Sequence, residues 1–269
     1  MIQEFTIAFS PCPNDTFIFD ALVNGKIDTG SYRFSTRLED VQTLNEWALG
    51  GKWPISKISY GVWPLLADRY RLLDAGGALG FGVGPLLISR APIHLEEMTN
   101  KRIAIPGKNT TAHHLFSMAF PDATLKEFLV FHEIEEAVLS GRVDAGVIIH
   151  ENRFTYAQKG LVKLMDLGAY WEEQLQCPVP LGGIVIRKDL PEALDQEISA
   201  LIRQSIQYSW QHYPLLSDYI KSHAQEMSED VMRQHIELYV NDYSLSLGEK
   251  GQKAVNTLVE SYLRHQSAH

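Results

Sequence analysis

The stretch that decides the fold lies near the start of the chain and reads Ser10-Pro11-Cys12-Pro13-Asn14-Asp15-Thr16-Phe17-Ile18-Phe19. It follows the apolar run 5–9, which predicts a first β-strand. The two prolines fix the backbone and remove two amide donors. Three polar side chains, Asn14, Asp15 and Thr16, then stand where a helix would begin. A strand that leads through a rigid polar turn into a helix indicates an open α/β sheet, in which ligands bind beyond the carboxyl ends of the strands. The same spacing also fits an ordinary helix cap.

The composition indicates a globular chain without a nucleic-acid partner. Its 269 residues suffice for one large domain or two small ones. Hydrophobic residues make up 45% and charged residues 21%, which is enough apolar material for a packed core. The net charge is −9, with Lys and Arg scattered along the chain, whereas a nucleic-acid-binding face requires clustered basic residues.

Nothing in the sequence indicates secretion or a membrane partner. The two cysteines, Cys12 and Cys177, do not make a disulfide framework. The start of the chain has no basic segment followed by an apolar one, as a signal peptide would. No apolar run approaches the roughly 18 residues of a membrane span. We therefore expect a cytoplasmic protein.

Alternating patterns along the chain predict βα units and a largely parallel sheet. Strands are expected at 5–9, 31–38 and 54–60, and helices at 15–24 and 41–49. A second unit follows, with strands at 101–105, 128–131 and 144–150 and helices from Thr110 to Phe120 and over 133–139. The run 182–187 would be the return crossover, and the last third reads as helical. We thus expect lobe 1 to comprise residues 1–87 with 186–269, and lobe 2 to comprise residues 88–185.

A glycine-rich segment marks the expected junction of the two lobes. Gly80, Gly82 and Gly84 alternate before Pro85 and a β-like run at 86–89. A dinucleotide-binding loop would need a helix directly after its last glycine, so we expect no nucleotide here. Glycines in a strand more often mark a bend or a close approach of two backbones. A segment that crosses between two lobes near a bound ligand would need both a bend and a close approach of backbones.

Thr110-Thr111 stands where a strand gives way to a helix. The unpaired amides and the dipole of a helix N-terminus favour a carboxylate or phosphate there, and the two hydroxyls add donors. An ordinary threonine cap explains the pair equally well from local sequence. A binding site is favoured because Thr110-Thr111 and Asn14-Asp15-Thr16 occupy equivalent positions. Each segment follows the first strand of its lobe, and the two would face each other across a cleft.

His150 ends an apolar strand and precedes a polar turn, which suits a general base. The neutral, proton-accepting form of histidine is available near neutral pH. Glu151 or a backbone carbonyl could fix its tautomer, and a histidine that is merely hydrogen-bonded at the edge of a lobe remains an alternative.

Other reactive side chains lack partners in the sequence. Cys12 has no identified base and reads as a packed thiol, and the adjacent His113 and His114 point in different directions along a helix. No metalloprotease, CxxC or nucleophile-elbow motif occurs, so no metal is expected. Lys57 could form a salt bridge or bind an acid group.

Several of these segments together resemble the 1,4-dihydroxy-6-naphthoate synthase family of the futalosine route to menaquinone. The segments are residues 10–17, Lys57-Ile58-Ser59-Tyr60, residues 76–80, Thr110-Thr111 and residues 148–156. The resemblance covers nearly the whole chain, to Tyr239-Val240-Asn241 and Ser244-Leu245. The first and the last of the five segments are the most specific.

The resemblance implies the fold of type II periplasmic binding proteins, with two α/β lobes, mixed sheets and a ligand between the lobes. It also implies cleavage of cyclic dehypoxanthine futalosine to 1,4-dihydroxy-6-naphthoate without metal or other cofactor. His150 matches the family's general base, and the residues matching its substrate contacts are Ile58, Ser59, Tyr60, Thr110 and Thr111. We add Asn14 and Lys57 as substrate contacts from their location alone.

Two alternatives share this fold. One is a solute-binding protein without catalytic activity, against which the missing export signal argues. The other is the related menaquinone enzyme that dehydrates chorismate, from which the segment Ser10–Phe19 is expected to be absent. No sequence feature predicts the oligomeric state.

Overall fold

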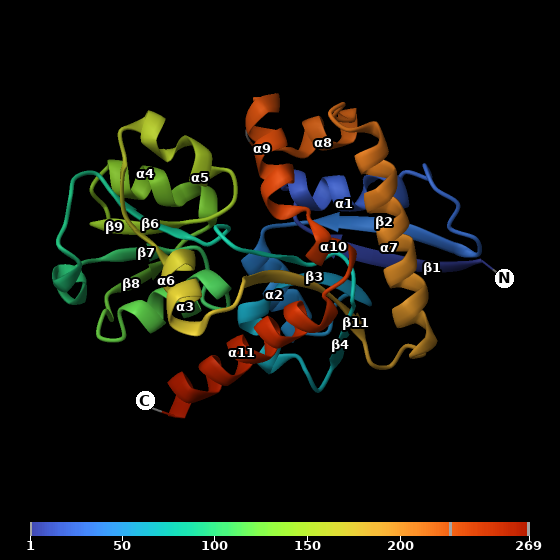
Figure 1. Cartoon of the computed structure of the whole chain (residues 1–269), viewed down its shortest axis with the longest axis horizontal. Coiled ribbons are helices and arrows are strands. Elements are labelled where there is room, and N and C mark those ends of the chain that lie inside the picture. Colours follow the sequence, from blue (N-terminus) through green and yellow to red (C-terminus); the bar gives the residue numbers. More distant parts are fainter. Residues whose placement is uncertain (1, 226–227, 268–269) are drawn as a thin grey trace.

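The computed structural model describes residues 2–225 and 228–267 and divides them between two α/β lobes (Figure 1). Residues 1, 226–227 and 268–269 of the predicted lobe 1 lie outside the described residues. Each lobe contains one mixed sheet rather than the largely parallel sheet predicted from the sequence. The boundaries predicted after residues 87 and 185 stay a prediction.

The first sheet has the strand order β2-β1-β3-β11-β4, with β5 also paired to β11. The strands are β1 (Gln3–Phe9), β2 (Tyr32–Leu38), β3 (Ile55–Ser59), β4 (Tyr70–Leu72), β5 (Ala78–Gly80) and β11 (Val179–Arg187). β1 is parallel to β2 and β3, whereas β11 runs antiparallel to its neighbours. The strands β1, β2 and β3 are therefore parallel to one another, and the long strand β11 makes the sheet mixed.

Helices cover both faces of this sheet. The larger core lies under α1 (Pro13–Val23), α7 (Ala193–His212), α8 (Asp218–His223) and α9 (Glu229–Tyr239). A smaller core on the opposite face involves α2 (Val41–Leu49) and the 3₁₀ turn η1 (Tyr60–Leu65). Both helices predicted near the N-terminus are present, and α2 has the predicted bounds.

The second sheet has the order β10-β6-β9-β7-β8. Its strands are β6 (Leu86–Ser89), β7 (Ile103–Ile105), β8 (Lys126–Phe128), β9 (Ala145–Ile148) and β10 (Val162–Asp166). Its helices are α3 (Thr111–Ala119), α4 (Ile134–Leu139), α5 (Asn152–Thr155) and α6 (Leu167–Leu175), and its 3₁₀ turns are η2 (Leu95–Asn100), η3 (Phe131–Glu133) and η4 (Tyr156–Lys159). The strand predicted at 128–131 was misplaced, because Phe131 begins η3 and packs its ring 4.9 Å from that of His150.

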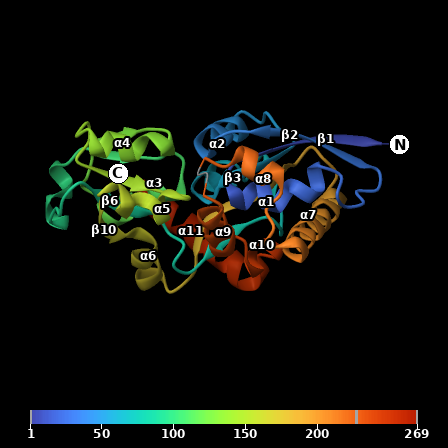
Figure 2. The same ribbon diagram turned by 90° about the horizontal axis from the view of Figure 1, so that it is seen from above.

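Two segments connect the lobes, one from β5 to β6 and one from α6 to β11. The C-terminal helices α10 (Asp242–Leu245) and α11 (Gly248–Ser267) follow, and α11 extends from lobe 1 toward α3 beneath the junction (Figures 1 and 2). Ala254, Val255 and Leu258 of α11 share one core with Tyr60 and Trp171. This shared core holds the two lobes together.

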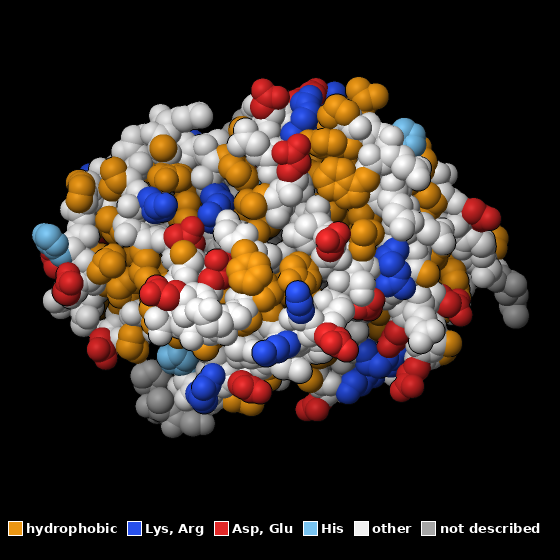
Figure 3. All heavy atoms as spheres, in the orientation of Figure 1, with side chains coloured by type: hydrophobic (Ala, Val, Ile, Leu, Met, Phe, Trp, Pro, Cys, Tyr) orange, Lys and Arg blue, Asp and Glu red, His pale blue; other side chains and the backbone are white. Residues whose placement is uncertain are grey.

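The surface carries mixed charge. On the face seen in Figure 3, Lys and Arg side chains are interspersed with Asp and Glu. Among the described residues, no helix combines the length and the apolar character that crossing a bilayer would require.

Gly61 allows a close approach between the lobes and provides a test of this packing. A Cβ atom there would lie 2.4 Å from the carbonyl carbon of Thr110 and 2.5 Å from the amide nitrogen of Thr111. We expect Gly61→Ala to lower the free energy of unfolding by about 1–3 kcal/mol, because the backbones must separate. Denaturant titration measures this change.

The matched control is Gly50→Ala at the end of α2. There φ is −75° and a Cβ would meet nothing closer than 3.5 Å, so the free energy of unfolding should change by less than about 0.5 kcal/mol. Equal stability of the two variants would contradict the close approach at Gly61.

Candidate active site

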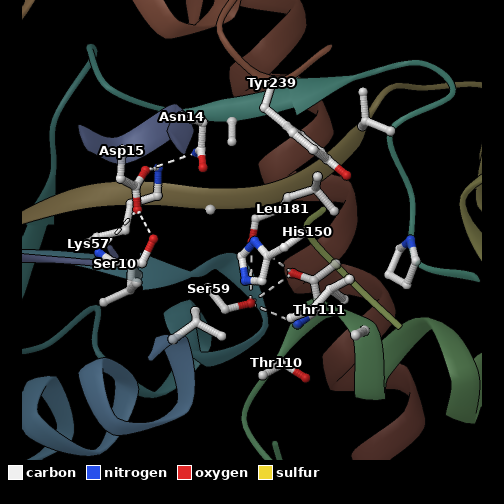
Figure 4. A pocket seen from close by; sticks show the side chains of 18 of the residues that line it. Ser10, Asn14, Asp15, Lys57, Ser59, Thr110, Thr111, His150, Leu181 and Tyr239 are labelled. Atoms are coloured by element: carbon white, nitrogen blue, oxygen red, sulfur yellow. Dashed lines mark hydrogen bonds and ion pairs between the residues drawn. The ribbon is translucent and has the colours of Figure 1, made fainter. Parts of the chain in front are cut away.

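A cavity between the lobes collects side chains from both sheets (Figure 4). The empty space is roughly 680 Å³, including its open mouth. The lining side chains include Ser10, Asn14, Asp15, Lys57, Ile58, Ser59, Thr110, Thr111, His150, Leu181, His235 and Tyr239. Seven of the eight predicted site residues are therefore brought together here.

Ser59 and Thr111 join the two lobes at the floor of the cavity. Ser59 ends β3, and its Oγ accepts the Thr111 amide at 2.8 Å and the Gly61 amide at 3.3 Å. The two hydroxyl oxygens are 3.1 Å apart, and the Thr111 hydroxyl also lies 3.1 Å from the Pro180 carbonyl oxygen. Both hydroxyls are thus oriented by the main chain and remain at the cavity surface.

Thr110 has a different role from its neighbour. Its Oγ1 accepts the His113 amide at 3.1 Å and donates to the Gly107 carbonyl at 2.8 Å. This is an N-cap of α3, so both sequence interpretations of Thr110-Thr111 apply, one to each residue. The capped helix directs the positive end of its dipole toward the cavity.

Charged side chains line the opposite wall. Lys57 Nζ lies 2.9 Å from Asp15 Oδ1, and both side chains are almost fully buried. Asp15 Oδ2 accepts the Ser10 hydroxyl at 2.7 Å and the Ser10 amide at 3.2 Å. The helix α1 has Cys12 as its N-cap, without a side-chain capping bond. The carboxylate of Asp15 therefore turns back to fix Lys57 and the polar turn instead of capping the helix.

His150 follows β9 with a φ of 58°, in the left-handed region that a residue with a side chain rarely adopts. The imidazole enters the cavity (Figure 4), and its buried Nε2 has no hydrogen-bond partner among the described residues. Burial lowers the pKa of His150 to about 4. The ring is consequently neutral at pH 7 and free to accept a proton.

Two residues that sequence reasoning did not assign to the cavity lie beside His150. His235 of α9 is fully buried, and its Nε2 lies 2.9 Å from Asn14 Oδ1. Its Nδ1 lies 3.7 Å from Glu151 Oε2. The sequence contained no signal for His235, since a histidine in an amphipathic helix is ordinarily a core residue. Glu151 was one of two candidates for fixing the tautomer of His150, and its carboxyl group lies near both His150 and His235.

Tyr60 is the predicted site residue whose side chain does not line the cavity. It is fully buried, and its hydroxyl and ring lie about 2.7 Å from where a Cβ of Gly183 would stand. Burial raises the pKa of its hydroxyl. The Tyr60 ring therefore packs within the core, on the opposite side of the chain from Ser59.

One trio of side chains is of a kind that binds metals. Cys12, His150 and Glu151 each place one ligand atom within 4.8 Å of the other two, the single such cluster in the described part of the chain. A closed structural zinc site uses four ligands with a thiolate at each cysteine. Burial raises the pKa of the Cys12 thiol. A neutral thiol is a poor metal ligand, so this geometry does not favour a resident metal.

Comparison with known proteins places the chain in a family. The family model described as "Menaquinone biosynthesis" matches residues 5–263. A curated 1,4-dihydroxy-6-naphthoate synthase from Thermus thermophilus is 44% identical over 96% of this chain and 93% of its own length. A crystal structure of an Archaeoglobus fulgidus protein has a TM-score of 0.91 at 32% identity, with 98% of each chain covered.

The predicted fold class is confirmed by a more distant structure. The periplasmic aliphatic sulphonate-binding protein of Escherichia coli has a TM-score of 0.64 at 12% identity, over 98% of this chain and 89% of that one. The chain thus combines the fold of a periplasmic binding protein with an inter-lobe cavity that holds a neutral histidine. The family match extends over nearly its whole length, and the chain belongs to the menaquinone-biosynthesis family.

Proposed function

We propose that the protein is a 1,4-dihydroxy-6-naphthoate synthase, a carbon–carbon lyase that converts cyclic dehypoxanthine futalosine to 1,4-dihydroxy-6-naphthoate in menaquinone biosynthesis. The observation that carries the mechanism is the buried Nε2 of His150 in the inter-lobe cavity, which accepts no hydrogen bond from any described residue. The curated relative's name supports the choice of reaction. The partner is a small molecule, and we place the enzyme in the cytoplasm.

His150 acts as the general base. It removes a proton beside a carbonyl group of the substrate, and a carbon–carbon bond then breaks as the ring system becomes aromatic. Aromatisation supplies the driving force, so a positioned base and donors for the developing oxyanion suffice. Closure between the lobes excludes water and aligns the bond that breaks.

The opposite ends of the cavity bind the substrate. Ser59 and Thr111, at the N-terminus of α3, hold the substrate carboxylate, as helix N-termini favour anions. Thr110 supports them as the cap of that helix. Ile58 provides an apolar contact, and Asn14 and Lys57 form a polar wall that contacts the remaining part of the substrate.

The first test of this function is turnover by purified protein. We expect the wild-type protein to form 1,4-dihydroxy-6-naphthoate from the cyclic futalosine, measured by chromatography. His150→Ala should lower kcat by about 10²–10⁴-fold, the usual contribution of a general base, while product binding measured by calorimetry persists.

The same assay separates the alternatives. A solute-binding protein would retain ligand without forming product, and a chorismate dehydratase would consume chorismate. Unchanged turnover in His150→Ala would refute the role of His150 even where the wild-type enzyme is active.

The pH dependence of kcat/KM reports the state of the base. His150 must be neutral to accept a proton, so activity falls as the pH drops through its pKa. Because burial lowers that pKa to about 4, we expect kcat/KM to hold constant from pH 7 to about pH 5 and to decline near pH 4. A decline centred near the ordinary histidine value of about 6.5 would show that the imidazole is solvated. Enzyme returned to pH 7 after acid exposure controls for unfolding.

Ser59→Ala tests the carboxylate-binding end. The substitution removes the acceptor of two main-chain amides and one donor for the substrate. We expect KM to rise by about 10-fold, corresponding to the loss of one hydrogen bond to a charged group, with a smaller change in kcat. A variant with wild-type KM would exclude a contact between this hydroxyl and the substrate.

A further inference from the structure

We propose that His235 is the proton donor of the site and that Glu151 connects it to His150, so that two imidazoles and one carboxyl group form an acid–base circuit. The proposal rests on the proposed function, in which His150 removes a proton from the substrate. The two imidazole rings are 6.0 Å apart and nearly parallel, with 17° between their planes. Both line the cavity.

The amide of Asn14 determines which nitrogen of His235 carries a hydrogen. Asn14 Nδ2 donates to Asp15 Oδ1 at 3.0 Å, and a carboxylate can only accept. The carbonyl oxygen of the amide must therefore face His235 Nε2, 2.9 Å away. This oxygen also accepts only, so Nε2 of His235 bears the hydrogen; the assignment follows from the hydrogen-bond network.

The other nitrogen of His235 then presents a lone pair to Glu151. Nδ1 and Glu151 Oε2 are 3.7 Å apart, a few tenths of an ångström beyond hydrogen-bond length. Two acceptors at this distance repel each other in a buried site, and one proton between them removes the repulsion. Burial, and then the nearby His150, lower the pKa of His235 well below its usual value. The ring therefore stays neutral, and Glu151 carries the proton as a carboxylic acid.

Glu151 is also close to the base. One of its oxygen atoms and one ring nitrogen of His150 lie within 4.8 Å of each other. The Glu151 side chain is 95% buried, and Glu151 is not among the residues that line the cavity. In the proposed circuit Glu151 approaches each ring to hydrogen-bond distance in turn and exchanges a proton with it, without touching the substrate.

The protons balance over one turnover. His150 takes a proton from the substrate, and the electron pair of that C–H bond joins the aromatic ring. The electron pair of the broken carbon–carbon bond leaves with the departing fragment, which takes a proton from Nε2 of His235. Glu151 transfers its proton to Nδ1 of His235, and its carboxylate then receives the proton held by His150. The number of protons in the site is thus restored, and His235 ends the turnover with its hydrogen on Nδ1. Exchange with water after the product leaves returns that hydrogen to Nε2.

Several described groups near this circuit are neutral or belong to ion pairs. Cys12, before α1, and Tyr239, on α9, have raised pKa values because of burial and remain neutral at pH 7. The charged neighbours form two ion pairs, Asp15–Lys57 and Arg153–Asp166. A neutral carboxylic acid at Glu151 is consistent with these surroundings.

Glu151→Gln tests the circuit in the full-length enzyme. Glutamine keeps the shape of the side chain and can donate to Nδ1 of His235, but it cannot transfer a proton. We expect kcat to fall about 10²-fold or more with KM unchanged. In the wild type we also expect activity to decline at high pH, as Glu151 loses the proton that the circuit needs. This decline should disappear in the variant, while the decline near pH 4 remains. A structural role for Glu151 would leave kcat and both limbs of the profile as in the wild type.

Glu135→Gln is the matched control. Glu135 is also a buried glutamate of lobe 2, with 4% of its surface exposed, and it binds Lys159 and Asn152 outside the cavity. We expect wild-type kcat and a wild-type pH profile in this variant. His235→Gln provides a second test of the donor and should lose kcat to the same extent as Glu151→Gln.

Nitrogen NMR of histidine-labelled protein tests the resting state without substrate. We expect a neutral His235 ring at pH 7 with its hydrogen on Nε2. A doubly protonated ring, a hydrogen on Nδ1 alone, or a Glu151→Gln variant with wild-type kcat and an intact high-pH limb would overturn the proposal. A wild-type enzyme that forms no naphthoate would refute the proposed function, and the NMR result would still decide where the proton resides.

Discussion

The site depends on one hydroxyl group, Ser59 Oγ, at the place where the two lobes meet. It accepts one main-chain amide from each lobe, Thr111 from α3 and Gly61 from η1. A helix N-terminus has amides without partners inside the helix, and here one of them is satisfied across the junction. Asn45 reinforces the contact, because it accepts the Ser59 amide and donates to the Asn109 carbonyl. These hydrogen bonds therefore link the two lobes beside the cavity.

The distribution of charge in the cavity follows from its burial. Lys57 and Asp15 form an ion pair on one wall, and removing one partner of such a buried pair typically costs about 3–5 kcal/mol. Their effects on the pKa of His150 oppose each other, since Asp15 raises it and Lys57 lowers it. Desolvation then dominates and keeps the imidazole neutral. The ion pair can thus bind a polar substrate without protonating the base beside it.

The sequence predicted the parts of the site that follow strands. Asn14 and Thr111 each follow the first strand of a unit, and the order of βα elements brings such turns to one edge. The orientation of Tyr60 was not predicted from its place next to Ser59, because the strand ends at Ser59 and Tyr60 begins the 3₁₀ turn η1, which directs its ring into the core. His235 could not be predicted as a site residue. It lies 221 residues after Asn14, and no local pattern indicates which face of a C-terminal helix contacts a turn near the N-terminus. The partners of Asp15 were not predicted, since its carboxylate binds Lys57 and Ser10 and not the amides of the helix terminus.

The backbone at His150 distinguishes this cavity from a site that only binds. A left-handed φ costs a residue with a side chain about 1–2 kcal/mol, and a buried nitrogen without a partner costs about 1–3 kcal/mol. A binding protein gains nothing from either cost, because it would satisfy the nitrogen or leave it in water. Nε2 has no partner among the described residues. Both energetic costs are explained if this nitrogen accepts a proton from the substrate. Under the proposed function, the strained turn after β9 is the feature that places the general base in the cavity.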